Sequence, residues 1–258
     1  MTHEATIDKL IKMRLSSMAD AYRNQLHDTS LSELSFTERF GILVDMEYRT
    51  RKNNRLKRLI NQATFEQGYA HIAGIDYNTR RKLDKEQIDF LATCQYIGEH
   101  HNIIIMSASG MGKTYLSCAL GMAACKQFYT VKYVRLPELL ADLAVARGEG
   151  TFKKVLAQYI KVSLLILDEW MLVSLKESEA RDILEIVNAR HKRASTIFCS
   201  QFSPAGWHGK IGEVTLADAI LDRIVHDSYQ ITIQSVDSDF SMRELYGINK
   251  KHNYHKDI

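Results

Sequence analysis

A glycine-rich turn followed by a lysine and a threonine lies near the middle of the chain. Residues 103–115 read Ile-Ile-Ile-Met-Ser-Ala-Ser-Gly-Met-Gly-Lys-Thr-Tyr, so an apolar stretch leads into the turn. Backbone N–H groups of such a turn can surround phosphate oxygens, while a lysine reaches the β- and γ-phosphates and a Ser/Thr hydroxyl holds Mg²⁺. Lys113 and Thr114 supply these two side chains. The run predicts a strand, a phosphate-binding loop and a helix whose N-terminus faces a nucleoside triphosphate.

One residue departs from the usual loop pattern, G-x-x-x-x-G-K-[ST]. Ser107 stands where that pattern begins with glycine. A small residue can open the turn if its φ is negative, because glycine is needed only where φ is positive or where backbone touches ligand. The alternative is a chance glycine-rich turn between a strand and a helix. On the first interpretation, the nucleotide contacts are Ser107, Ala108, Ser109, Gly110, Met111, Gly112, Lys113, Thr114 and Tyr115.

Two acids end an apolar strand further along the chain. Residues 164–167 are Leu-Leu-Ile-Leu, and Asp168 and Glu169 follow them. Unbroken apolar runs suit a strand buried on both faces of a parallel sheet, and such strands end at the edge where ligands bind. Asp168 is therefore expected to hold Mg²⁺ together with Thr114, and Glu169 to activate an attacking water. Taken alone, the acid pair would be a solvated strand end, but after a phosphate loop it indicates ATP hydrolysis.

Length and composition restrict the class of protein. The chain has 258 residues, which suits one large domain or a main domain with a small one. Hydrophobic residues make up 45%, as in soluble globular proteins, and no apolar run approaches the ~18 residues that span a bilayer. The four cysteines form no Cys-x-x-Cys pair, which favours reduced thiols over a metal site. Together with the lack of a signal-peptide core, these features predict a cytoplasmic protein with no membrane partner.

Positive charge is concentrated in one short segment, although the net charge is only +3. Residues 49–58 contain six cations and no acid. Such a cluster can neutralise DNA phosphates and release counterions. A solvated helix face explains the same cluster equally well. The DNA-binding candidates are Arg49, Arg51, Lys52, Arg55, Lys57 and Arg58.

The order of elements predicts two domains. Apolar residues at helical spacing indicate one helix over 7–26 and another from Thr37 to about Gln62, before a turn-rich stretch near 68–79. We expect residues 1–70 to form a small helical domain that binds DNA or a partner, and residues 71–258 to form an ATPase domain. Helices and strands alternate in the second domain, which predicts an α/β fold with a parallel sheet flanked by helices. The expected strands are 103–106, 131–135, 164–167 and 195–200, and the expected helices include 85–99, 114–127, 152–159 and 177–192.

Taken together, these motifs resemble the AAA+ ATPases, and more narrowly the IstB/DnaC group, over nearly the whole chain. The group pairs a small helical N-terminal domain with an AAA+ P-loop core, so the resemblance implies the same fold here. Two segments, Ser-Gln-Phe-Ser-Pro-Ala-Gly-Trp-His at 200–208 and Leu-Asp-Arg-Ile-Val-His at 221–226, are more similar to IstB-type transposition helpers than to helicase loaders. The narrower resemblance is also carried by residues 107–114, 164–169, 219–224 and 241–243.

The resemblance implies roles that the local sequence leaves open. Ser200 and Gln201 end a predicted strand, and the family implies that they contact the γ-phosphate or its water. Arg223 matches the arginine finger, which completes a neighbouring subunit's site, and Arg243 matches sensor 2, which touches phosphate within its own subunit. From sequence alone, Ser200 and Gln201 fit a simple strand-to-loop transition, and either arginine fits a surface or interface ion pair.

We therefore expect a Mg²⁺-dependent ATPase with Lys113, Glu169 and Arg223 as catalytic residues. ATP sites at subunit interfaces imply a homo-oligomer, and the basic segment implies assembly on double-stranded DNA. By resemblance, the protein is a transposition helper that selects or remodels target DNA and engages a transposase. Two alternatives stay open. One is a loader for a replicative helicase, and the other is a nucleotide-dependent scaffold that does not hydrolyse ATP, which Ser107 favours.

Overall fold

The chain divides into two compact units between Arg58 and Leu59. The computed structural model describes residues 2–77, 81–235 and Met242. The domain boundary expected from the sequence lies later, between residues 70 and 71. The segment from Leu59 onward belongs with the second unit, where Leu59 and Ala63 are buried and Thr64 Oγ1 donates to the carbonyl of Tyr133 at 3.2 Å. No helix in the described ranges is long and apolar enough to cross a bilayer.

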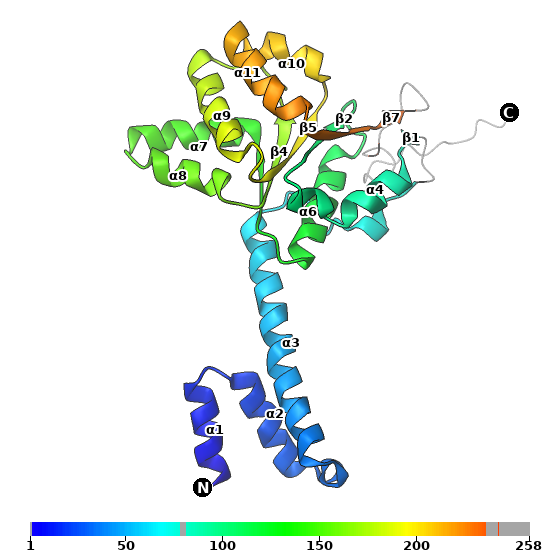
Figure 1. Ribbon diagram of the computed structural model, residues 1–258, viewed down its shortest axis with the longest axis vertical. Coiled ribbons are helices and arrows are strands. Elements are labelled where there is room, and N and C mark those ends of the chain that lie inside the picture. The colour runs from blue at the N-terminus through cyan, green and yellow to red at the C-terminus, as the bar shows by residue number, and fades with distance from the viewer. Residues whose placement is uncertain (1, 78–80, 236–241, 243–258) are drawn as a thin grey trace, which may run out of the picture. The chain divides into compact units, whose positions relative to one another are not determined.

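The N-terminal unit is helical (Figure 1). Its elements are α1 (His3–Lys12), α2 (Ser16–His27), the short 3₁₀ helix η1 (Thr29–Glu33) and the first part of α3 (Phe36–Ala63). The single helix expected over 7–26 is thus two helices, because Arg14 adopts a left-handed φ of 60° between them. The start of α3 is fixed by a reciprocal cap, in which Ser35 N–H donates to Glu38 Oε2 at 2.8 Å and Glu38 N–H donates to Ser35 Oγ at 3.3 Å.

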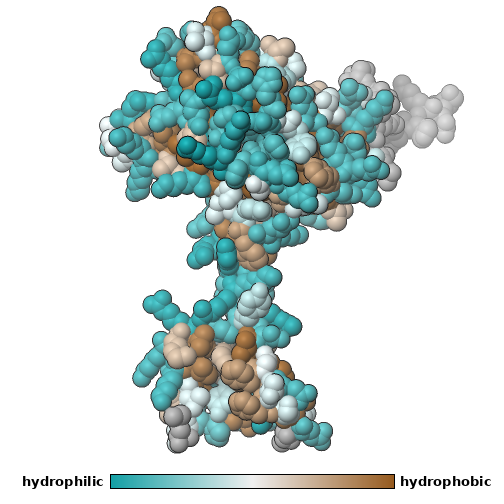
Figure 2. Space-filling model, in the orientation of Figure 1, coloured by the Kyte–Doolittle hydropathy of each residue, from teal (hydrophilic) through white to brown (hydrophobic). Residues whose placement is uncertain are grey.

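A buried carboxylate helps to hold this small unit together. Glu47, on α3, is only 8% exposed. It accepts from Met18 N–H at 3.0 Å and from Arg51 Nε at 2.6 Å. These bonds lower the pKa of Glu47 despite its burial, which acts in the opposite direction. Brown, hydrophobic areas are visible on the surface of this unit (Figure 2). Phe36 and Tyr48 of α3 are large side chains that the structure leaves exposed.

The second unit is built on a five-stranded parallel sheet with the order β3-β4-β5-β2-β6. The strands are β2 (Asn102–Met106), β3 (Val131–Arg135), β4 (Leu164–Trp170), β5 (Ser195–Ser200) and β6 (Ser228–Thr232). Ile103, Ile104 and Ile105 of the interior strand β2 are all fully buried, as expected for a strand covered on both faces. The sheet confirms the predicted α/β fold class. A separate antiparallel pair joins β1 (Arg81–Lys82) to β7 (Gln234–Ser235).

Helices cover both faces of this sheet (Figure 1). On one face, Leu165 and Leu167 of β4 share a core with residues of α7 (Leu136–Gly148), α8 (Phe152–Ile160), α9 (Glu177–Arg190), α10 (Pro204–Ile211) and α11 (Val214–Val225). On the other, Ile166 meets Gly121 of α6 (Lys113–Lys126), and α4 (Lys85–Ala92) packs on α6. The helix expected over 85–99 is interrupted before α5 (Gln95–Gly98), because Cys94 has a left-handed φ of 61°.

A buried arginine donates hydrogen bonds to groups at the N-terminal ends of β4 and β5. Arg190, at the end of α9, is 2% exposed, and burial lowers its pKa to about 9. Its Nη1 donates to three carbonyls that precede β4, and its Nε donates to Thr196 Oγ1 on β5 at 3.0 Å. Its Nη2 donates to the carbonyl of Ser195. The guanidinium thereby fixes the start of the strand that ends in Asp168.

Candidate functional site

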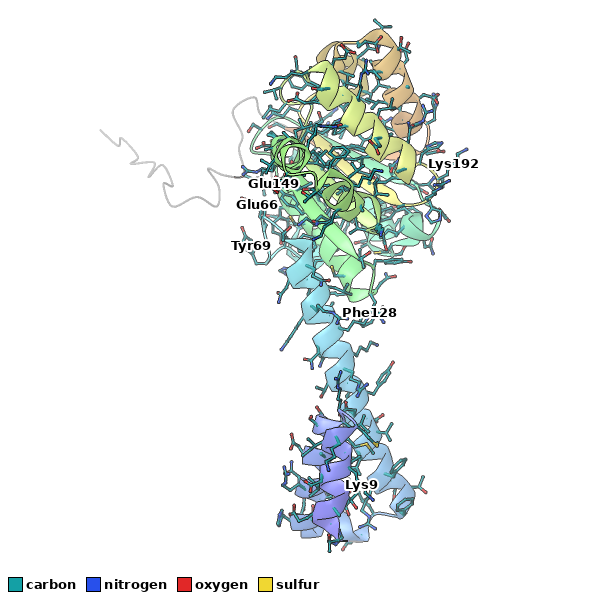
Figure 3. All side chains as sticks on the ribbon, turned by 90° about the vertical axis from the view of Figure 1, so that its left-hand side faces the viewer. Lys9, Glu66, Tyr69, Phe128, Glu149 and Lys192 are labelled. Atoms are coloured by element: carbon teal, nitrogen blue, oxygen red, sulfur yellow. The ribbon has the colours of Figure 1, made fainter. Side chains whose placement is uncertain are left out.

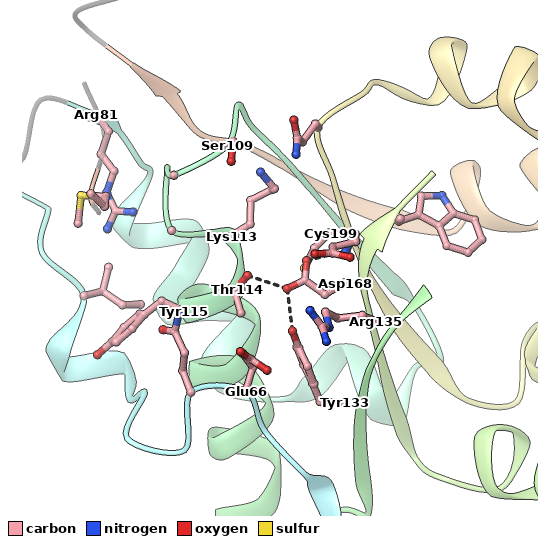
Figure 4. Close-up of a pocket in the computed structure, with 18 of the residues that line it drawn as sticks. Glu66, Arg81, Ser109, Lys113, Thr114, Tyr115, Tyr133, Arg135, Asp168 and Cys199 are labelled. Atoms are coloured by element: carbon pink, nitrogen blue, oxygen red, sulfur yellow. Dashed lines mark hydrogen bonds between the residues drawn. The ribbon is translucent and has the colours of Figure 1, made fainter. Parts of the chain in front are cut away.

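A cavity of about 840 Å³ opens at the carboxyl ends of the central strands (Figure 4). This volume is within the range of pockets that hold small molecules and cofactors. The cavity lies where α6 begins and where β3, β4 and β5 end. Its lining comprises Glu66, Gln67, Tyr69, Gly74, Ile75, Asp76, Arg81, Ser109, Gly110, Gly112, Lys113, Thr114, Tyr115, Tyr133, Arg135, Asp168, Glu169, Trp170, Leu172, Cys199, Gln201 and Met242.

The predicted phosphate loop forms one wall of this cavity. It connects β2 to α6, and its two glycines need their conformational freedom, since Gly110 has φ 79° and Gly112 has φ 91°. A Cβ on Gly112 would also lie 2.6 Å from Arg81 Nη1. Ser107 is not among the residues with positive φ in the described chain, which is why serine fits where glycine is usual. Six of the nine predicted loop residues line the cavity, whereas Ser107, Ala108 and Met111 are not among its lining residues.

The ammonium group of Lys113 lies across the loop. Its Nζ donates to the carbonyls of Ser107 and Ala108, both at 2.8 Å, and approaches Ser107 Oγ at 3.3 Å. The serine that replaces the usual glycine therefore adds a hydroxyl contact to the lysine. Lys113 also begins α6, so its cation and the positive end of the helix dipole act on the same part of the cavity. This arrangement favours an anion there.

Asp168 is the most constrained acid in the cavity. It is 4% exposed, and its Oδ2 accepts from Thr114 Oγ1 at 2.6 Å and from Tyr133 OH at 2.9 Å (Figure 4). Its Oδ1 accepts from the backbone N–H of Glu169 at 2.8 Å. Burial, together with the Asp168 charge, raises the pKa of Tyr133, so the phenol remains a donor. Side chains of β3 and α6 thus donate to one carboxylate, which β4 carries.

A bulge in β4 brings both predicted acids into the cavity. Successive side chains of a regular strand point to opposite faces, so neighbouring acids would not share a site. The register shifts between Leu167 and Trp170, where three steps on β4 face two on β5. Glu169 has a left-handed φ of 54° within this irregularity. The extra residue allows Asp168 and Glu169 to line the same cavity.

Of the two residues that the resemblance assigns to the γ-phosphate, Ser200 at the end of β5 and Gln201 after it, only Gln201 lines the cavity. Ser200 is 1% exposed, and its hydroxyl donates to the carbonyl of Trp170 at 2.9 Å. The same oxygen accepts from Phe202 N–H at 3.1 Å and from Trp207 Nε1 at 2.9 Å. In this arrangement Ser200 joins the residue after Glu169 to α10, and its hydroxyl faces the protein interior.

Of the two arginines to which the resemblance assigns a role, Arg223 and Arg243, only Arg223 lies among the described residues. Arg223 lies on α11, where its Nη1 donates to the carbonyl of Ala219 at 2.6 Å, and it is not among the residues that line this cavity. Arg243 lies outside the described residues. Its neighbour Met242 lines the cavity and donates its N–H to the carbonyl of Gly110 at 2.9 Å.

Several residues that line the cavity were not predicted from the sequence. Tyr133 and Arg135 are two apart on β3, so strand alternation places them on one face, and Arg135 pairs in register with Asp168. That pattern could have revealed them, because the strand itself was predicted. An ion pair with Glu138 raises the pKa of Arg135.

The segment after α3 supplies a second group of lining residues that had no sequence signal. Figure 3 labels Glu66 and Tyr69 close together on this segment. Arg81, which follows it, is 6% exposed and donates to the carbonyls of Met111 at 2.6 Å and Asp76 at 3.3 Å. A buried guanidinium therefore ties this segment to the phosphate loop.

The oxygen donors of the cavity suit a hard divalent cation. Thr114 Oγ1 and Asp168 Oδ2 are 2.6 Å apart and belong to different elements. Mg²⁺ is usually bound by one or two carboxylates together with substrate phosphates and water, and it does not need a cage of protein ligands. The described ranges contain no group of three or more His, Cys, Asp or Glu side chains placed to hold a metal.

Comparisons with known proteins agree with this geometry. The model of the family described as IstB-like ATP binding protein matches residues 8–244. An insertion sequence ATP-binding protein from Sinorhizobium fredii is 38% identical over 233 residues, covering 90% of this chain and 95% of the relative. The corresponding protein of insertion sequence IS1162 from Pseudomonas fluorescens is 39% identical over 201 residues, covering 78% and 87%.

Solved structures resemble the fold at lower sequence identity. The crystal structure of DnaI superposes with a TM-score of 0.57 at 21% identity, covering 69% of this chain and 94% of that one. At this identity the similarity is one of fold. It confirms the predicted AAA+ architecture.

Proposed function

This chain belongs to the IstB-like ATP-binding family of AAA+ proteins, and from that premise we propose a more specific function. The protein is a Mg²⁺-dependent ATPase that assembles on duplex DNA and helps a transposase to select or remodel its target. The observation that supports it most strongly is one cavity that contains Lys113, the Thr114–Asp168 pair and Glu169. The relatives named as ATP-binding proteins of insertion sequences support the link to transposition.

Each group in the cavity has a role in binding and hydrolysis. Lys113 and the backbone N–H groups of the loop bind the β- and γ-phosphates of ATP. Thr114 and Asp168 would hold Mg²⁺, which would supply positive charge to offset that of the nucleotide phosphates. Glu169 accepts a proton from the attacking water and orients it. Arg223 of a neighbouring subunit completes the site, so hydrolysis depends on assembly of a homo-oligomer.

We expect Glu169→Gln to bind ATP normally and to lose hydrolysis by about 10²–10⁴-fold, because the amide is nearly isosteric but cannot accept the proton. The measurement is steady-state phosphate release with and without duplex DNA, beside nucleotide affinity by fluorescence titration. Glu185→Gln is the matched control, since Glu185 is exposed on α9 and does not line the cavity. Equal turnover by wild type and Glu169→Gln would favour a scaffold that does not hydrolyse ATP.

The basic cluster of α3 is the proposed DNA contact. Its six cations are exposed. Arg51 also bonds to the buried Glu47 and, through Nη2, to the carbonyl of Arg14 at 2.7 Å. Arg51 therefore stabilises the N-terminal unit as well as carrying charge. Lys52, Arg55 and Arg58 recur at three-residue spacing and share one helix face, which makes them the better residues to test.

We expect the triple variant Lys52→Gln, Arg55→Gln, Arg58→Gln to bind duplex DNA more weakly and with a flatter salt dependence. Each lost phosphate contact removes about 0.9 from the slope of log K against log salt, so the slope should fall by as much as about 3. A triple variant of Lys9, Lys12 and Arg23, which are exposed on α1 and α2, makes the same charge change elsewhere. An unaltered slope in the α3 variant would assign DNA binding to another surface.

The client protein can be identified by capture under native conditions. Assembly on DNA with ATP should recover a transposase. Recovery of a replicative helicase without a transposase would instead make the protein a helicase loader that uses the same ATPase core.

A further inference from the structure

Tyr133 makes a side-chain contact to Asp168 that the proposed ATPase mechanism leaves without a function. The side chain is 4% exposed and lies on β3, next to the strand that carries Asp168. Its hydroxyl donates to Asp168 Oδ2 at 2.9 Å, and Thr114 Oγ1 donates to the same oxygen at 2.6 Å. Two donors from different elements therefore converge on one oxygen of the carboxylate (Figure 4).

The tyrosine is a rigid donor. Its backbone is paired with β4, where Tyr133 is in register with Ile166, and its carbonyl accepts from Thr64 Oγ1 at 3.2 Å. Its ring is buried, so the hydroxyl has little freedom to leave the carboxylate. The other oxygen, Oδ1, is held by the backbone N–H of Glu169 at 2.8 Å. Both oxygens of the carboxylate are thus fixed, and with them the direction in which Oδ2 faces Thr114.

We propose that Tyr133 is a positioning residue for the Mg²⁺-nucleotide site, whose hydroxyl holds Asp168 in the orientation that binds the divalent cation together with Thr114. This inference rests on the proposed ATPase function and adds a residue to it. Tyr133 acts through Asp168, so its loss changes the requirement for Mg²⁺ and leaves the contacts of the loop with phosphate unchanged. Residues that orient metal ligands in this way typically contribute about 10–100-fold to metal affinity.

The test is a titration of Tyr133→Phe, which keeps the ring and removes the hydroxyl. A fluorescent ATP analogue is bound to the full-length protein first in EDTA and then with increasing Mg²⁺. We expect the affinity in EDTA to stay within about 2-fold of wild type, while the Mg²⁺ concentration for half-maximal enhancement rises about 10–100-fold. Tyr133→Met also lacks the hydroxyl donor and should shift the Mg²⁺ requirement in the same direction. It replaces Tyr133→Phe in the titration if the Phe variant does not fold.

A matched control is available in the same unit. Tyr159 is also buried, and its hydroxyl donates to Asp142 Oδ2 at 2.6 Å, but neither residue lines the cavity. Tyr159→Phe therefore removes the same kind of hydrogen bond elsewhere, and its Mg²⁺ titration should match wild type. Thermal melting of both variants measures the stability that each bond contributes.

Three outcomes would overturn the inference and leave the proposed function standing. A Mg²⁺ titration of Tyr133→Phe that coincides with wild type would leave the hydroxyl a structural role only. A fall in EDTA affinity with an unchanged Mg²⁺ requirement would make Tyr133 a direct nucleotide contact. An equal shift in Tyr159→Phe would indicate general loosening of the unit. Wild-type protein that binds the analogue without any effect of Mg²⁺ would instead contradict the proposed function itself, and the inference with it.

Discussion

Replacement of Arg223 by alanine is expected to reduce ATP hydrolysis by the DNA-bound assembly by about 10³-fold or more, which is the usual contribution of an arginine finger. Nucleotide affinity should change little. The reason is that a guanidinium supplied by a neighbour offsets charge that develops on the γ-phosphate in the transition state, whereas ground-state binding depends on the loop and on Lys113.

The position of Arg223 supports a role in trans. The residue lies in the last turn of α11, and its guanidinium donates to the carbonyl of Ala219 on the same helix. It does not line the cavity of its own chain. An isolated subunit therefore has the loop and the acids but lacks this cation, so its hydrolysis should be slow until copies assemble.

A mixture of the two inactive variants Arg223→Ala and Glu169→Gln distinguishes an arginine finger from an arginine with a structural role. Arg223→Ala keeps Glu169, and Glu169→Gln keeps Arg223, so mixed assemblies contain some interfaces with both groups. Hydrolysis should reappear in the mixture, although each variant alone is inactive. Arg193→Ala, at an exposed position of the same unit, is the control and should retain wild-type activity. A normal rate for Arg223→Ala, or a mixture that stays inactive, would exclude a finger at this position.

Lys113→Ala should weaken ATP binding by about 100-fold or more. A hydrogen bond to a charged group contributes about 1.5–3 kcal/mol, and a lysine that reaches two phosphates makes more than one such bond. Loss of about 3 kcal/mol alone would weaken affinity roughly 100-fold. The carbonyls of Ser107 and Ala108 would also lose the ammonium that bridges them, so the loop would be less well ordered.

The same helix offers a control for Lys113. Lys126 is exposed in the last turn of α6, at the opposite end from the phosphate loop. Lys126→Ala makes the same charge change and should bind ATP like wild type. Isothermal titration or fluorescence binding of both variants is the measurement. Wild-type affinity in Lys113→Ala would contradict the assignment of the loop.

The parts of the site that could be predicted are those encoded locally. The strand, glycine turn and helix around residues 103–115 are indicated by a short run of neighbouring residues, and they are where the sequence placed them. The acid pair, which lies within β4, was also visible in the sequence. The bulge that turns Glu169 into the cavity was not, because it depends on how β4 pairs with β5.

Other features depend on tertiary contacts and left no sequence pattern. Arg14 and Cys94 interrupt helices in left-handed conformations, although neither residue type normally ends a helix. The segment that contributes Glu66 and Tyr69 to the lining has no periodicity, so its position against the loop follows from bonds such as that between Arg81 and Met111. Ser200 looked like a phosphate contact, but its hydroxyl is shared among buried groups that only the fold brings together.

The most direct test of the account is a cryo-electron microscopy reconstruction of the full-length protein with Mg²⁺, a non-hydrolysable ATP analogue and duplex DNA. The account predicts an oligomer on DNA in which the phosphates lie between Lys113 and Asp168 of one subunit, with Arg223 of a neighbour facing the γ-phosphate. An assembly on DNA whose cavities contain no nucleotide, or whose nucleotide lies away from the phosphate loop, would contradict it.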